Sequence, residues 1–141
     1  MRAAVVVAAL AAAAALVAAC PGALQDPAAF TAACPDVPSQ IFAMRCAGSG
    51  CHGADAPAAS LDLVSPGVAE RLYARPAAGG PGLLIDPANP DGSVLVRKLT
   101  PTPPFGAQQP PGAPLDPATI DCIRRWVRSV GIADLPPGAS D

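Results

Sequence analysis

The spacing of apolar residues along this chain predicts several short helices. The clearest signal lies at 118–130, where apolar residues recur at steps of three and four and so share one face of a helix. These residues are Ile120, Ile123, Trp126, Val127 and Val130. Arginines 124, 125 and 128 occupy the opposite face, which predicts a solvated surface. Gly131 follows, where a left-handed residue commonly ends a helix.

Helix starts are marked by a residue pair that occurs three times, a good N-cap residue followed by proline. Proline suits the first helical position because the N–H that it lacks would have no partner there. The three pairs are Ser65-Pro66, Asn89-Pro90 and Asp116-Pro117. They predict helices at 67–74, 91–99 and 118–130. An earlier helix is expected to start at Pro38 or Ser39 and to bury Ile41 and Phe42 before it reaches Cys46.

The segments between these helices are rich in glycine and proline, and no run alternates as a strand does. We therefore expect an all-α domain of short helices joined by long loops. Long loops in a small domain usually serve a function or wrap around something. The aromatic content is only 4% and alanine is abundant, so the core is thin. Such a domain benefits from a covalent staple or a large buried cofactor.

The N-terminal segment reads as an export signal. Residues 1–20 contain one arginine and an unbroken apolar run from Ala3 to Ala19, and small residues precede Cys20. This pattern is similar to a bacterial lipobox and predicts a lipoprotein signal peptide with lipidation at Cys20. Residues 21–33 would then be a tether, 34–132 the domain and 133–141 a disordered tail. The protein is expected to be exported and anchored to a membrane, in the periplasm or at the outer membrane.

Charge restricts the possible partners. The formal net charge is −2, and no basic stripe is present, so nucleic acid is not an expected partner. Lysine occurs once, at Lys98, and every other cation is an arginine. Outside the cytoplasm thiols rarely stay reduced. Apart from Cys20, four cysteines remain, Cys34, Cys46, Cys51 and Cys122, and spacing alone does not rank their three possible pairings.

The stretch CAGSGCH, from Cys46 to His52, concentrates two thiols and the only histidine in seven residues. A zinc site would need a second, distant pair of ligands. A thiol catalyst would need a base that can reach it, and His52 is a poor base for its neighbour Cys51. A simple disulfide leaves His52 unexplained. Haem attachment uses all three residues, since two thiols bind the vinyl groups and the histidine binds iron. Four residues separate the cysteines instead of two, and Gly48 and Gly50 suit the bulge that this requires.

The chain resembles the c-type cytochrome domains of planctomycete and myxobacterial secreted proteins and lipoproteins. The resemblance covers about residues 34–131 and rests on IFAMRCAGSGCHG, SLDLVSPGVAERL, LLIDPANPDGSVLVRKL and PLDPATIDCIRRWVRSVGI. It implies an all-α, cytochrome c-like fold in which the first and last helices cross and bring Phe42 near Trp126. It also implies one covalent haem c, electron exchange with an unknown redox partner protein, and no small-molecule substrate or enzymatic reaction. If those helices cross, Cys34 and Cys122 come close enough for a disulfide; the alternative is two buried free thiols.

One position departs from the family pattern. Gln109-Pro110 stands where a methionine and proline are expected, which makes Gln109 a possible distal position beside water or an empty site. Met44 is the one methionine that follows the expected signal peptide, and it is expected in the core. Axial methionine raises a haem potential, so a lower potential is predicted here. Two alternatives follow: a haem-free lipoprotein with two disulfides that serves as a binding or structural module, and a haem sensor with an open sixth site.

Overall fold

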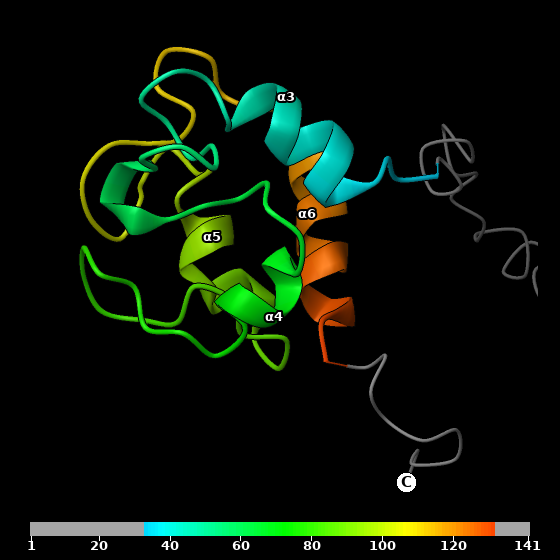
Figure 1. The fold of residues 1–141 in the computed structure, drawn as a ribbon. Coiled ribbons are helices and arrows are strands. Elements are labelled where there is room, and N and C mark those ends of the chain that lie inside the picture. Colours follow the sequence, from blue (N-terminus) through cyan, green and yellow to red (C-terminus); the bar gives the residue numbers. More distant parts are fainter. Residues whose placement is uncertain (1–32, 132–141) are drawn as a thin grey trace, which may run out of the picture. The chain divides into compact units, whose positions relative to one another are not determined.

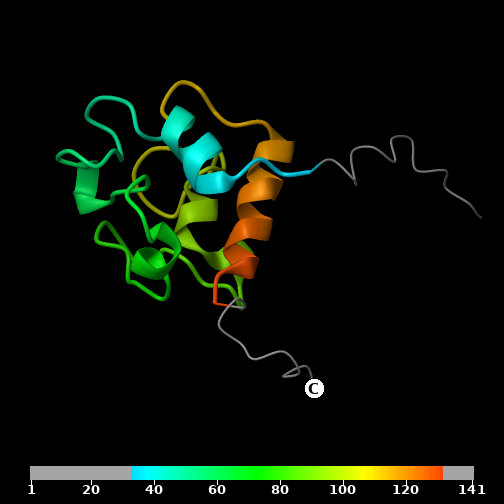
Figure 2. The same ribbon diagram turned by 45° about the vertical axis from the view of Figure 1, so that its right-hand side comes forward.

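The computed structural model describes residues 33–131, and these residues form short helices joined by long loops (Figures 1 and 2). The expected signal peptide with Cys20, nearly all of the tether and the C-terminal tail lie outside the described residues. The elements in chain order are η1 (Val37–Phe42), α3 (Ala43–Arg45), η2 (Ala58–Ser60), α4 (Val68–Leu72), η3 (Pro90–Gly92), α5 (Val94–Arg97) and α6 (Pro117–Ser129). Within 33–131, extended segments pair only at two isolated bridges, Tyr73 with Ile85 and Pro76 with Leu83.

Side-chain caps start the first and last helices. Asp36 precedes η1 and accepts a hydrogen bond from the Ser39 N–H at 2.9 Å. Asp116 precedes α6 and accepts one from the Thr119 N–H at 3.0 Å, so α6 begins where the Asp-Pro pair predicts. Both bonds satisfy donors that the first helical turn leaves free. Beyond α6, Gly131 has a φ of +83°, the left-handed conformation expected after a helix.

The predicted start of α4 is wrong. Gly67, with a left-handed φ of 72°, is its N-cap, and no side chain caps this helix. Ser65 instead donates its N–H to Asp62 at 2.9 Å, in a turn that Asp62 closes before the helix. The Ser65 side chain, together with the N–H groups of Ser65 and Val64, holds the pKa of Asp62 at about 2. Arg71 completes this turn through the Ser65 carbonyl at 2.8 Å and the Asp62 carboxylate at 3.7 Å.

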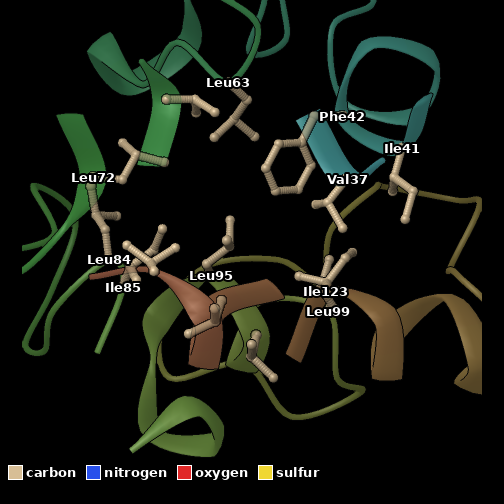
Figure 3. Packing of buried hydrophobic residues seen from close by; sticks show 14 of the residues in the cluster. Val37, Ile41, Phe42, Leu63, Leu72, Leu84, Ile85, Leu95, Leu99 and Ile123 are labelled. Carbon is tan, nitrogen blue, oxygen red and sulfur yellow. The ribbon is translucent and has the colours of Figure 1, made fainter. Parts of the chain in front are cut away.

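The core lies where η1, α5 and α6 meet the apolar residues of the loops (Figure 3). Its largest fully buried side chains include Phe42, Leu72, Ile85 and Ile123. Phe42 packs edge-on against Trp126, with ring centroids 5.3 Å apart at 90°. Aromatic pairs favour this arrangement because the positive edge of one ring meets the negative face of the other. The first and last helices are therefore in direct contact, as expected.

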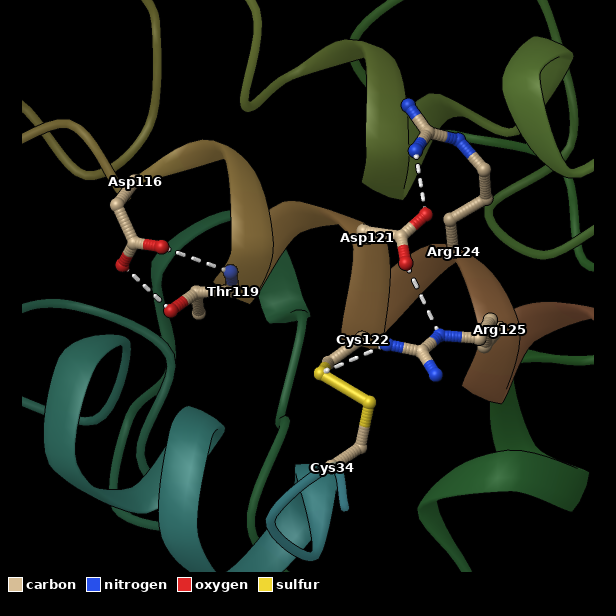
Figure 4. The surroundings of a disulfide bond; sticks show 7 residues. All are labelled: Cys34, Asp116, Thr119, Asp121, Cys122, Arg124 and Arg125. Carbon is tan, nitrogen blue, oxygen red and sulfur yellow. Dashed lines mark hydrogen bonds and ion pairs between the residues drawn. A yellow bond between two sulfur atoms is a disulfide. The ribbon is translucent and has the colours of Figure 1, made fainter. Parts of the chain in front are cut away.

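Two cross-links tie α6 to the rest of the domain. Cys34 and Cys122 form a disulfide that joins the segment before η1 to the first half of α6 (Figure 4). Arg124 forms an ion pair with Asp91 of η3 at 2.6 Å. On the arginine face of α6, Arg125 and Arg128 are exposed, as the sequence predicts, and Arg124 is half-buried. No helix within residues 33–131 is long and apolar enough to cross a bilayer.

Candidate functional site: a cavity shared by two thiols and a histidine

The loop between Cys46 and His52 is closed by its own backbone. Cys46 ends the first helical segment and donates its N–H to the Phe42 carbonyl at 2.8 Å. The His52 N–H then returns to the Cys46 carbonyl at 2.8 Å, which closes the loop around the five residues between them. Gly50 adopts a φ of +72°, which favours glycine, so the widened spacing is accommodated as a tight bulge.

The ring of His52 is held by a backbone acceptor. Its Nδ1 lies 3.1 Å from the Leu61 carbonyl oxygen. A carbonyl can only accept a hydrogen bond, so Nδ1 carries the proton and Nε2 of the neutral ring keeps a free lone pair. Metal-binding histidines are typically oriented by such a bond on the nitrogen that does not bind the metal. This contact was not predicted from the sequence, because the acceptor is a main-chain oxygen nine residues away.

Both thiols and the imidazole line one cavity of about 400 Å³. Cavities of roughly 300–1,000 Å³ hold cofactors and other small molecules. The apolar wall comes from core residues of η1, α5 and the loops between them, several of which Figure 3 labels. These residues include Phe42, Leu63, Leu84, Leu95 and Leu99. The body of a ligand bound here would therefore be apolar.

The cavity carries positive charge without negative charge. Arg45, Arg75 and Lys98 line it, and none of its lining residues is an aspartate or glutamate. None of these three cations pairs with a carboxylate among residues 33–131. The ion pairs of this part of the chain use Arg71, Arg124 and Arg125 instead. An apolar chamber with unpaired cations fits a ligand that has an apolar body and acidic groups.

The two thiols of the cavity differ in exposure. Cys51 is exposed, whereas Cys46 is partly covered by the core, and the two are not bonded to each other. Burial raises the pKa of the Cys46 thiol to about 11. Within residues 33–131 no group of three His, Cys, Asp or Glu side chains is placed to hold a metal ion. The other cysteine pair, Cys34 and Cys122, does not line the cavity.

Gln109, the possible distal position, lies on the cavity wall. Its N–H donates to the Lys98 carbonyl at 2.7 Å, which attaches the 100–115 loop to the end of α5. Phe105 of this loop packs against Gly79 and Gly80 so closely that a Cβ on either glycine would overlap its ring. The placement of Met44 in the core is wrong. Met44 is 77% exposed and does not line the cavity, because α3 turns it outward.

Sequence reasoning did not assign Lys98, Arg45 or Phe105 to the site. Two of the three had weak signals, since Lys98 is one lysine among arginines and Phe105 is one phenylalanine in a glycine- and proline-rich loop. Only the folded chain shows that all three line the chamber that contains His52. Comparison of the chain with protein-family models, curated proteins and solved structures finds no match, so the site itself has to carry the functional argument.

Proposed function

We propose that this protein is a monohaem c-type cytochrome that carries single electrons. The observation that carries the proposal is the bond from His52 Nδ1 to the Leu61 carbonyl, because it leaves Nε2 able to bind iron in a chamber that also contains both thiols. Each thiol would add across one haem vinyl group, with a carbon–sulfur bond formed and the thiol hydrogen transferred to the other vinyl carbon. Bound haem would supply an iron centre that gains and loses one electron.

The residues of the cavity fit a haem group in three respects. The apolar wall matches the porphyrin, and Arg45 and Arg75, which pair with no carboxylate among residues 33–131, match its two propionates. The unbonded thiols of Cys46 and Cys51 provide both attachment points. In this proposal the protein exchanges electrons with a redox partner protein. It would not transform a substrate and so would not act as an enzyme.

The test is covalent haem content after expression with a c-type maturation system. We expect a pyridine haemochrome signal and an intact mass that includes one haem. Cys46→Ala with Cys51→Ala should abolish both, and His52→Ala should remove the low-spin spectrum of the iron. Cys34→Ala with Cys122→Ala is the matched control, because it also removes two cysteines but neither of them lines the cavity. A folded, haem-free protein with Cys46 and Cys51 joined in a disulfide would instead establish a stapled binding module.

We further propose that the domain is exported and anchored through lipid on Cys20. The Cys34–Cys122 disulfide supports an oxidising compartment, since such bonds are rare in the cytoplasm. Labelled fatty acid should be incorporated by the wild-type chain and not by Cys20→Ala, while haem content stays equal. Labelling that persists in the variant would place the lipid elsewhere, and none in either chain would favour an ordinary secretory signal.

A further inference from the structure

The cavity holds few groups that could complete the coordination of a haem iron bound to His52. Arginine stays protonated and has no lone pair to donate, which excludes Arg45 and Arg75. Ser60 and Gln109 present only neutral oxygens. Thioether sulfur is absent from the cavity lining, because Met44 lies outside it. Lys98 is the one remaining nitrogen donor among the described residues of the wall.

Lys98 is held at this wall by contacts with α5 and with the 100–115 loop. It follows α5 as the C-cap residue and is half-buried. Its Nζ donates to the Phe105 carbonyl at 2.7 Å and lies 4.9 Å from the centroid of the Phe105 ring. The Gln109 N–H bonds to the Lys98 carbonyl, so the amine stands on the same wall as the expected distal position. No carboxylate among residues 33–131 pairs with this cation.

The choice of lysine at this position also separates it from every other cation of the chain, all of which are arginines. The contacts with the Phe105 carbonyl and ring do not require lysine, because a guanidinium also donates to carbonyls and stacks on aromatic rings. What lysine adds is an amine that can release a proton and offer a lone pair. In this cavity such a lone pair could bind the iron of a haem.

We propose that Lys98, and not Gln109, is the sixth ligand of the iron. The inference rests on the proposed cytochrome function. On ligation, the ammonium releases one proton to solvent, its hydrogen bond to the Phe105 carbonyl breaks, and the nitrogen lone pair binds the metal. No electron is transferred in this step. The iron is then low-spin, and His52 and Lys98 each supply one nitrogen ligand besides those of the porphyrin. Its spectrum lacks the near-infrared band of a thioether–iron bond.

The matched variants are Lys98→Arg and Gln109→Leu in haem-loaded protein. Lys98→Arg keeps the charge and the contacts with Phe105 but cannot ligate, so we expect loss of the low-spin ferric spectrum. Gln109→Leu should leave that spectrum unchanged. The proposal is overturned if Lys98→Arg retains the wild-type spectrum, if Gln109→Leu loses it, or if wild-type iron is already high-spin.

A second measurement leaves Lys98 itself unchanged and so does not depend on whether Lys98→Arg folds. Because Lys98 is the only lysine, reductive methylation followed by peptide mass spectrometry reports on one side-chain amine. We expect Nζ to be protected in haem-loaded protein and modified in the haem-free Cys46→Ala, Cys51→Ala protein. Equal modification of both overturns the ligand assignment while leaving the cytochrome intact. Absence of covalent haem in the wild type refutes the proposed function itself and is recognised beforehand by the haemochrome assay.

Discussion

Removal of the Cys34–Cys122 disulfide gives the most quantitative prediction. The bond joins residues 88 apart in the chain, so it restricts a large loop in the unfolded state. In the chain-entropy description, closing a loop of that length stabilises the folded state by about 4–5 kcal/mol at 25 °C. Small domains have a total stability of roughly 5–15 kcal/mol, so the change is a large part of the whole. Cys34→Ala with Cys122→Ala should therefore lower the free energy of unfolding by about 4–5 kcal/mol.

The assay is urea denaturation followed by far-UV circular dichroism, with the wild type and the double variant compared at equal haem content. Wild-type protein treated with a thiol reductant is the internal control, because thioether bonds to haem resist such reagents. It should unfold at the same urea concentration as the variant. A loss of stability below about 1 kcal/mol would refute the reasoning, since it would mean that the bond does not restrict the unfolded chain.

Three further predictions concern single sites. Hydrogen bonds lower the pKa of Asp62 from 3.8 to about 2, so its carboxylate should stabilise the fold above pH 3.8 and lose that effect as the pH falls towards 2. The difference in unfolding free energy between wild type and Asp62→Asn should therefore shrink over this range. A difference that stays constant would contradict this prediction. Gly80→Ala should destabilise the domain by about 1–3 kcal/mol, because its Cβ would overlap the Phe105 ring, and the cost should largely vanish in a Phe105→Ala background when both are measured by urea denaturation. In reduced, haem-free protein, iodoacetamide should alkylate the exposed Cys51 well before Cys46, whose pKa of about 11 leaves little thiolate at neutral pH; equal rates in a peptide mass analysis would refute the burial of Cys46.

The sequence predicted the last helix well because two independent local signals agree there. Asp116 caps α6 by accepting a hydrogen bond from the Thr119 N–H, and the apolar residues of α6 repeat with the helical period. The start of α4 was missed because Ser65 and Asp62 form a turn of their own, and a cap signature does not show which of two local hydrogen-bonding patterns is formed. Local signals thus locate helices better than they locate their first residues.

The candidate site was predicted less completely than the helices. Cys46, Cys51 and His52 are adjacent in the chain, so their motif could be read directly. The orientation of His52 depends on a carbonyl at Leu61, and a main-chain oxygen leaves no residue-type signal. The approach of Lys98 to the same chamber depends on how the chain returns after α5, which is a property of the tertiary fold.

The contact between Phe42 and Trp126 has a consequence for when the chain can fold during its synthesis. The first helix of the domain finds its aromatic partner only in the last one, so the core is incomplete until α6 has been synthesised. Such distant contacts form slowly, because the intervening chain must be closed into a loop first. In a nascent chain that still lacks α6, Phe42 has no Trp126 to pack against, so we expect folding to wait for α6. That delay suits a protein which we propose is threaded through a translocation channel before it folds.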